Sequence, residues 1–486
     1  MQRRAKVHTA MLRRSSEEPH RCPQPARSVL ALALACATAT GVPALALASA
    51  PAIQEPAIQE PAATDPATAD SAPAESACPE APPAGVTPTS ARPGTTAWPV
   101  PPFAAWVGLD TVYIRVKPRV PSNLQGVLRR GDTVTVTGCL PDCAAPKAWA
   151  LLAPWQGAVK LASLRPLPVT PQAFAESAAA RYVYGKVPRP KTPVFARPDV
   201  RSKVLRKEKA EFRLAFVPDE ALYTQGWLQR PDGGFMRLKD VPMFKPSAFT
   251  GFVNPPDRVA FVRRKVKLKG LPKGHEPVLF QRYDRPEVLA VKGAKVFVAG
   301  TPAGTWLPKD LVRIAQRQRR PKEVRPNERW LHIDLGQQVL TTYEGDDLVF
   351  ATLISAGKAD RRSTRTTDGV FRIYAKTIHS SMRGKPWDDY YAEEVPYVMH
   401  FKAGQALHGA YWHDQFGIQK SHGCVNLSIA DARWVFEWMP PELPTGWHGV
   451  LPVSAKLPGV YIAIEKPGRK PRAKAQLAAW EPTRPH

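Results

Sequence analysis

Cysteine and acidic residues are scarce in this 486-residue chain, and its uninterrupted apolar runs are short. The six cysteines contain one close pair, Cys139 and Cys143, and the lack of a second pair at ligand spacing argues against a zinc site. Lysine and arginine number 68 against 42 for aspartate and glutamate, which gives a net charge of +26. A basic chain attracts polyanions, but the absence of a recognisable reading motif disfavours a nucleic-acid binder.

The N-terminal residues have the pattern of a secretory signal. A basic stretch precedes an apolar run at residues 29–39 that residues 42–48 extend, and breaks such as Gly41 and Pro43 make the run poor as an uncleaved membrane anchor. Cleavage after Ala48 is favoured over cleavage after Ala50, and lipidation at Cys36 has a weaker motif. Residues 1–50 are therefore predicted to be a signal peptide. The mature chain is expected in the periplasm or cell envelope, with no membrane segment after cleavage.

Proline is abundant, with 53 residues, and points to linkers and short loop-rich modules. Residues 51–100 repeat PAIQE and continue as a Pro/Ala-rich tract that cannot bury enough apolar surface to fold, so they predict a disordered linker. The linker is interpreted either as a tether that reaches the wall or as a spacer of no fixed length. Residues 466–486 are predicted to be a basic disordered tail.

The middle of the chain predicts small β modules. Alternating segments such as residues 111–116, 132–137 and 148–152, separated by Gly/Pro turns, indicate a small β-barrel over residues 101–175. Similar patterns predict a second module at 180–245 and a third at 246–320. Their order resembles bacterial Src-homology-type barrels, which accompany wall enzymes. The modules either bind wall peptides or act as spacers packed on a neighbouring domain. Cys139 and Cys143 either form a disulfide or stay free thiols.

Basic residues concentrate in this middle part, whereas residues 325–465 are close to neutral. The basic surface either binds anions such as peptidoglycan carboxylates or lipid headgroups, or is simply solvated.

The C-terminal part predicts strands at residues 331–335, 339–343, 348–354, 369–374 and 397–401. Ser428 and Asp431 then form the pattern of a capping box, with aspartate in place of glutamate, before a helix with apolar residues at helical spacing. Residues 380–397, rich in aromatic and acidic side chains, are interpreted either as a lid over a cleft or as an ordinary surface loop.

Chemically reactive residues gather just before this helix. Residues 421–424 read Ser-His-Gly-Cys, and His408-Gly409 lies upstream. Cysteine is a good nucleophile as thiolate, and a nearby imidazole is the usual way to form one. The glycines permit a tight turn whose N–H groups could converge as an oxyanion hole.

The stretch LHGAYWHDQFGIQKSHGCVNLS, residues 407–428, resembles the active-site signature of the L,D-transpeptidases, the YkuD-type catalytic domain. Residues 330–343 resemble the opening hairpin of that family, and residues 366–371 resemble its T-P-x-G-x-F segment, with Thr367 where proline is usual. The resemblance covers residues 326–465. It implies a mostly β chain: an L,D-transpeptidase-type β-sandwich preceded by the β-barrel modules and the disordered linker.

The resemblance also implies roles for the motif residues. Cys424 would be the nucleophile and His408 the base, with His422 as the rival base. The Gly409 carbonyl would orient an imidazole, and the N–H groups of Gly423 and Cys424 would bind the oxyanion. The remaining motif residues, Ser421 and Asn426, would hold the loop, and two further histidines, His400 and His413, are interpreted as structural.

The activity so implied is that of an exported peptidoglycan L,D-transpeptidase without metal or organic cofactor. Cys424 would attack the carbonyl of the third stem residue, D-alanine would leave, and an acceptor would resolve the thioester. A stem amine as acceptor gives a cross-link, water gives an L,D-carboxypeptidase, and a protein lysine anchors that protein to the wall. The alternative from another class is a non-catalytic wall-binding scaffold.

Overall fold

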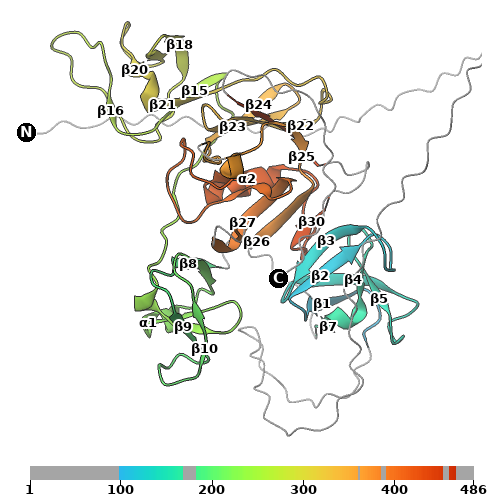
Figure 1. Cartoon of the computed structure of the whole chain (residues 1–486). Coiled ribbons are helices and arrows are strands. Elements are labelled where there is room, and N and C mark those ends of the chain that lie inside the picture. The colour runs from blue at the N-terminus through green and yellow to red at the C-terminus, as the bar shows by residue number, and fades with distance from the viewer. Residues whose placement is uncertain (1–97, 168–181, 360–361, 385–389, 452–458, 467–486) are drawn as a thin grey trace, which may run out of the picture. The chain divides into compact units, whose positions relative to one another are not determined.

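The computed structural model describes residues 98–167, 182–359, 362–384, 390–451 and 459–466 (Figure 1). By its backbone contacts the chain divides into Met1–Thr89 and Ser90–His486, and every described residue belongs to the second unit. The predicted signal peptide and nearly all of the predicted linker and tail lie outside the described residues. Within the described part, no helix is both long and apolar enough to cross a bilayer.

The first group of strands spans residues 103–166 and encloses a small apolar core. In β2 the side chains of Val112 and Ile114 are buried while their neighbours face outward, as the alternation in the sequence predicted. Cys139 and Cys143 form a disulfide beside β4. The elements are β1 (Phe103–Val107), β2 (Thr111–Arg115), β3 (Leu124–Arg129), β4 (Thr133–Leu140), β5 (Trp149–Leu152), β6 (Gly157–Lys160), η1 (Leu161–Ser163) and β7 (Leu164–Pro166).

The second group follows with its own core, in which Val194, Leu214 and Met236 are fully buried. Its short helix α1 begins after Asp219, whose carboxylate accepts the N–H of Leu222. The elements are β8 (Val183–Lys186), β9 (Thr192–Phe195), β10 (Val204–Glu208), β11 (Arg213–Phe216), α1 (Glu220–Thr224), β12 (Trp227–Gln229), β13 (Phe235–Arg237) and η3 (Leu238–Asp240).

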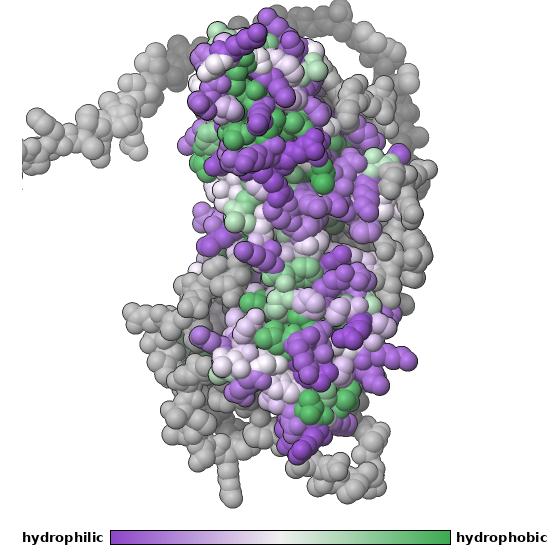
Figure 2. Space-filling view, turned by 90° about the vertical axis from the view of Figure 1, so that its left-hand side faces the viewer, coloured by the Kyte–Doolittle hydropathy of each residue, from purple (hydrophilic) through white to green (hydrophobic). Residues whose placement is uncertain are grey.

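The third group carries many exposed lysines and arginines around a core that includes Val262, Val296 and Leu307. Figure 2 views the molecule from the left-hand side of Figure 1, and most side chains on that face are hydrophilic, with smaller apolar patches between them. Residues 307–308 form a two-residue strand, and residues 309–311 continue as a 3-10 helix. The elements are β15 (Arg258–Val262), β16 (Val266–Lys267), β17 (Leu279–Phe280), β18 (Val288–Lys292), β19 (Lys295–Val298), β20 (Leu307–Pro308), η4 (Lys309–Leu311) and β21 (Val312–Gln316).

The C-terminal part has two sheets and a helix around the largest core cluster. One sheet has the order β14-β24-β23-β22-β31-β25, and the other contributes the run β29-β28-β27-β26-β30. The shared core unites residues from both sheets, such as Ile333 and Met399, with Val435 of α2. The elements are β14 (Phe252–Val253), β22 (Arg329–Asp334), β23 (Val339–Glu344), β24 (Asp347–Leu353), η5 (Arg362–Thr364), β25 (Gly369–Arg372), β26 (Ala375–Arg383), β27 (Tyr391–Lys402), β28 (Gln405–Gly409), β29 (Val425–Leu427), α2 (Ile429–Trp438), β30 (Gly449–Val450) and β31 (Tyr461–Glu465).

The first two groups are joined to the C-terminal sheet by backbone pairing. Strand β30 pairs with β26 on one side and with β3 of the first group on the other. Trp447 is buried in the core of the first group and donates its Nε1–H to the carbonyl of Ala153 at 3.1 Å. Strand β11 of the second group pairs in parallel with β27 at Arg213 and Ala392. Both groups are therefore attached to the same sheet as β28, the strand that carries the motif histidine His408: the first through β30 and β26, the second directly to β27.

Two local expectations need correction. Residues 380–383 and 391–397 belong to the antiparallel strands β26 and β27 rather than to a surface loop, and residues 385–389 lie outside the described part, so the lid interpretation is not tested. Ser428 does cap α2 by accepting the N–H of Asp431, as predicted. The Asp431 carboxylate, however, does not complete a capping box, because it accepts the N–H of Gly251 at 2.7 Å and the hydroxyl of Thr352 at 2.5 Å. Burial raises the pKa of Asp431 to about 6.

Candidate active site

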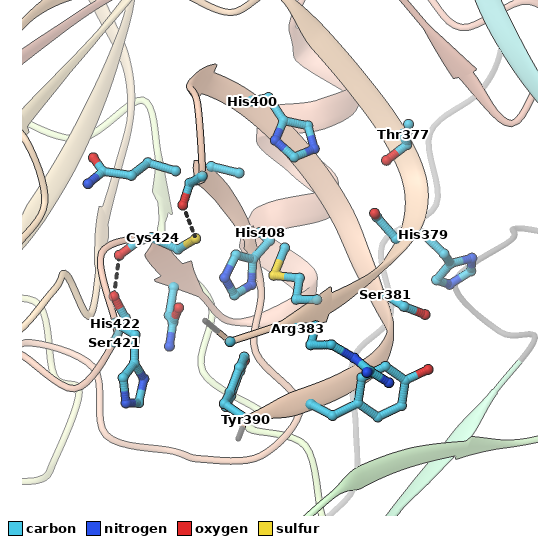
Figure 3. Close-up of a pocket in the computed structure, with 18 of the residues that line it drawn as sticks. Thr377, His379, Ser381, Arg383, Tyr390, His400, His408, Ser421, His422 and Cys424 are labelled. Atoms are coloured by element: carbon cyan, nitrogen blue, oxygen red, sulfur yellow. Dashed lines mark hydrogen bonds between the residues drawn. The ribbon is translucent and has the colours of Figure 1, made fainter. Parts of the chain in front are cut away.

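A cleft of about 1590 Å³ opens beside strands β26 to β28 (Figure 3). Cys424, His408, His422, Ser421 and Asn426 all line it. Residues of the first two strand groups, among them those of β2, β3 and β11, line it as well. The motif residues predicted from the sequence are thus brought together in one cavity, apart from two glycines. Gly409 and Gly423 do not line it, but they are next in sequence to His408 and Cys424, which do.

The pairing of β28 with β29 decides which side chains reach the cleft. The strands run in parallel, with Leu407 opposite Val425 and His408 opposite Asn426. Leu407 and Val425 belong to the core cluster, so by strand alternation His408 and Asn426 face the other way. Cys424 immediately precedes Val425, so its side chain points to the same side as those of His408 and Asn426. A one-residue slip in this register would exchange the core and cleft faces of both strands.

The Ser-His-Gly-Cys turn is held by its own serine. Ser421 Oγ donates to the carbonyl of Cys424 at 2.5 Å and accepts the N–H of Gly423 at 3.1 Å. Gly423 has a φ of +127°, a conformation that L side chains rarely adopt, so glycine is required here. The Gly423 N–H, expected from the sequence as an oxyanion donor, is engaged within the loop in this structure.

A threonine from outside the motif buttresses the turn. Thr366 Oγ1 donates to the carbonyl of Gly423 at 2.8 Å and accepts the N–H of Gly357 at 2.8 Å. A Cβ on Gly357 would lie 2.2 Å from the Thr364 carbonyl oxygen and 2.9 Å from Gly423 Cα, so only glycine lets these segments approach. Thr366 opens the segment that resembles the family's T-P-x-G-x-F pattern, but the sequence alone predicted no role for it. The role of Gly357 was missed, because no local pattern marks a contact with the distant turn.

The thiol of Cys424 is half-buried and neutral in this environment. Its Sγ lies 4.0 Å from the carbonyl oxygen of Gly404, as a weak donor. Burial raises the pKa of the thiol to about 11, although the backbone N–H of Ala406 acts in the opposite direction. A thiol with this pKa is almost wholly protonated at neutral pH, so a base must remove its proton during any reaction.

His408 has the tautomer that a base at this position needs. Its Nδ1 lies 3.1 Å from the carbonyl oxygen of Gly409, which can only accept, so Nδ1 carries the proton and Nε2 is the basic nitrogen. Burial lowers the pKa of His408 to about 4, which keeps the ring neutral at pH 7. In Figure 3 the His408 ring lies beside the Cys424 side chain, whereas the exposed His422 ring points away from it.

Asn426 and His413 form a polar pair next to this site. The N–H of Gln415 donates to His413 Nδ1 at 3.1 Å, so the ring proton sits on Nε2, 3.0 Å from the side-chain amide of Asn426. The structure places Asn426 Nδ2 at this distance, and turning the amide by 180° would present its oxygen to the Nε2–H as the matching acceptor. Burial, assisted by the charges of Lys420 and Arg213, lowers the pKa of His413 to about 4. His413 thereby orients Asn426 on the cleft face.

His400 and Tyr374 form a pair of aromatic rings in the cleft. Their rings stack at a centroid distance of 5.9 Å, and both line the cleft. Burial lowers the pKa of His400 to about 4 and raises that of Tyr374 to about 12, and a thiolate at Cys424 would raise the pKa of Tyr374 further. No local pattern pointed to a role for Tyr374. Among the residues that the structure describes, no group of three or more His, Cys, Asp or Glu side chains is arranged to hold a metal ion.

Comparison with known proteins gives this region a family. Residues 328–453 match the model of the L,D-transpeptidase catalytic domain, YkuD. The chain is 24% identical over 136 residues to YciB of Bacillus subtilis (strain 168), whose name assigns it provisionally to the L,D-transpeptidases. That match covers 24% of this chain and 64% of YciB, so the chain spans less than two thirds of its relative.

Solved structures of L,D-transpeptidases are also similar to part of the chain. A variant of the Enterococcus faecium enzyme is 20% identical with a TM-score of 0.23, and the match covers 28% of this chain and 50% of that one. The Mycobacterium smegmatis enzyme is 19% identical with a TM-score of 0.23, covering 33% and 72%. The assignment rests on the family model and not on these scores. Residues 328–453 belong to the YkuD family of L,D-transpeptidase catalytic domains.

Proposed function

We propose that the chain is a peptidoglycan L,D-transpeptidase in which Cys424 is the nucleophile and His408 the general base. The observation that carries the proposal is the common cleft face of β28 and β29. It presents the only free cysteine among the described residues next to an imidazole whose Nε2 is unprotonated. The family of residues 328–453 supplies the substrate class, peptidoglycan stem peptides.

The proposed reaction has two half-reactions that share one proton acceptor. Cys424 Sγ attacks the carbonyl of the third stem residue while its proton passes to His408 Nε2. The scissile C–N bond then breaks, the leaving D-alanine amine takes that proton, and a thioester remains on Cys424. An acceptor amine attacks the thioester, gives up a proton through His408, and the thiol is restored. The backbone N–H of Cys424 stabilises the oxyanion, and that of Gly423 joins it by releasing Ser421 Oγ.

The neutral thiol and neutral imidazole imply that the resting enzyme holds no thiolate–imidazolium pair. With a thiol pKa near 11, the thiolate fraction at pH 7 is small and grows with pH. We therefore expect alkylation of Cys424 by iodoacetamide to accelerate about tenfold per pH unit between pH 7 and pH 9. The rate is followed by mass spectrometry of the proteolytic peptide that contains Cys424. A rate that is already at its plateau at pH 7 would show a preformed ion pair and contradict this electrostatic account.

Product analysis tests the proposed function. Purified muropeptides with tetrapeptide stems are incubated with the protein, and the products are identified by mass. We expect release of D-alanine together with cross-linked dimers. Tripeptides without dimers would assign the hydrolytic alternative, an L,D-carboxypeptidase, and transfer to an added protein would assign wall anchoring at a lysine. No release of D-alanine would overturn the enzyme and leave a wall-binding scaffold.

Export to the periplasm or cell envelope is part of the proposal. The family acts on the cell wall, and the Cys139–Cys143 disulfide is typical of proteins outside the reducing cytoplasm. The predicted signal peptide, residues 1–50, would provide the route.

The three strand groups before residue 326 are proposed to be small Src-homology-like modules. The burial of Trp447 in the first group and the pairing of β11 with β27 support the interpretation that the first two groups are packed on the catalytic domain.

A further inference from the structure

The guanidinium of Arg213 lies in the cleft, although Arg213 belongs to the second strand group and not to the family domain. Its central carbon lies 4.8 Å from the centroid of the Tyr390 ring and 5.3 Å from that of Trp412. Both rings also line the cleft. Aromatic rings stabilise a guanidinium through its planar face and leave the N–H groups at its edge available.

Among the residues that the structure describes, Arg213 differs from its neighbours because its charge has no carboxylate partner. Among the described residues, no oxygen acceptor is hydrogen-bonded to its guanidinium and no carboxylate pairs with it. By contrast, Arg129 in the same cleft pairs with Glu394 at 3.2 Å, and the buried Arg230 pairs with Glu393 at 2.8 Å. A half-buried, uncompensated guanidinium in a cleft is suited to bind an anion that arrives with the substrate.

The position of Arg213 is fixed by the strand to which it is attached. Its backbone pairs with Ala392 of β27, and its carbonyl accepts the hydroxyl of Tyr411 at 3.4 Å. Two residues along β11, the N–H of Ala215 donates to the Glu393 carboxylate at 2.8 Å. The second strand group therefore holds Arg213 against the same strand, β27, that lies beside the motif strand β28.

One aromatic layer separates Arg213 from the proposed base. The Trp412 ring, which contacts Arg213, lies 5.7 Å from the His408 ring between centroids. The charge of Arg213 also reaches His413, whose pKa it helps to lower. An anionic group bound to Arg213 would thus sit within a few side chains of the reacting centre.

We propose that Arg213 binds a carboxylate of the peptide substrate and so selects stems with a free carboxylate near the scissile bond. The proposal rests on the proposed function for the identity of the substrate as a stem peptide. It assigns to the second strand group a direct part in substrate selection. The carboxylate belongs either to the C-terminal leaving residue or to a side chain of the stem, and the test distinguishes these sources.

Binding is measured by calorimetry on the full chain carrying Cys424→Ala, so that no turnover occurs. The probes are a synthetic tetrapeptide stem, the same stem with a C-terminal carboxamide, and the same stem with its side-chain carboxylates amidated. We expect one of the two amidations to weaken binding roughly 10- to 100-fold, and this identifies the carboxylate. Arg213→Met is expected to weaken binding of the unmodified stem by the same factor and to abolish the preference for that carboxylate.

Two further variants complete the experiment. Arg213→Lys keeps the charge without the planar fork and is expected to fall between the wild-type residue and Arg213→Met. Arg201→Met, at an exposed position of the same strand group outside the cleft, is expected to bind like the parent protein. If neither amidation changes binding to the protein that retains Arg213, the proposal is overturned, even where Arg213→Met fails to fold.

The two proposals fail separately. If the protein that retains Arg213 shows no preference for a free carboxylate but the wild-type protein still releases D-alanine, only the role of Arg213 is removed. Absence of D-alanine release with carboxylate-dependent binding would remove the transpeptidase and leave a stem-binding cleft.

Discussion

Cys424→Ala is expected to reduce D-alanine release from tetrapeptide stems by about 10⁴-fold or more, because the proposed reaction has no other nucleophile. The same variant should take up no carbapenem, whereas the wild-type protein should gain one covalent adduct, as a β-lactam carbonyl is open to the same attack. Release of D-alanine is measured in a coupled assay and the adduct by intact-protein mass.

Loss of folding does not explain such a result in this protein. The Cys424 Sγ interacts with the backbone N–H of Ala406 and lies 4.0 Å from the Gly404 carbonyl, and the turn is held by Ser421 and Thr366 instead. The melting temperature of Cys424→Ala should therefore stay close to that of the wild type. Wild-type rates of D-alanine release by Cys424→Ala would remove the cysteine from the mechanism.

His408→Gln is expected to lower kcat by about 10²- to 10⁴-fold, the range that a positioned general base contributes. Its Nδ1 bond to the Gly409 carbonyl leaves Nε2 as the acceptor, and an amide cannot take up the thiol proton. His422→Gln is the matched control from the same motif. Because the exposed His422 ring points away from the thiol, its rate should stay within about tenfold of the wild type (Figure 3).

If His422→Gln lowers kcat more than His408→Gln does, the base is His422 and not His408. The pH profile gives a second readout, because burial holds the pKa of His408 near 4. The free enzyme should keep its base competent down to about that pH, and activity should fall only below it.

The strands were predictable where one face is buried, because alternation repeats over a few residues. The segment at Thr111–Arg115 is an example. The predicted strands at Arg329–Asp334 and Val339–Glu344 are buried on both faces, and their burial does not alternate. The Ser428 cap was predictable because its partner, the N–H of Asp431, lies only three residues away. The partners of Asp431 were not, because Gly251 and Thr352 come from distant segments, and a local pattern does not encode which buried groups meet.

The joining of the sheets was equally beyond local reasoning. Strand β30 is two residues long, yet it pairs with both β26 and β3, and no periodicity can be read in so short a segment. The segment 380–397, interpreted from the sequence as a lid or a surface loop, contains strands because its residues pair across the β26–β27 hairpin and with β11. Tertiary pairing outweighed its polar and aromatic composition.

For the candidate site, the motif supplied the chemistry and the register supplied the geometry. The sequence indicated a cysteine with two histidines, but only the parallel pairing of β28 and β29 puts Cys424 and His408 on one face. Arg213 was missed because β11 reaches the cleft through the pairing of a different strand group. Gly357 was missed because it contacts the turn through space.

The most direct test of the central claim is the mass of the protein captured during turnover. The wild-type chain is mixed with a tetrapeptide stem in the absence of acceptor amine, quenched in acid within seconds, and analysed as intact protein and by peptide mapping. The account predicts an adduct of stem mass minus D-alanine, located on the peptide that contains Cys424 and removed by hydroxylamine. An adduct on any other residue would contradict the account. D-alanine release that leaves no adduct and that Cys424→Ala also shows would contradict it as well.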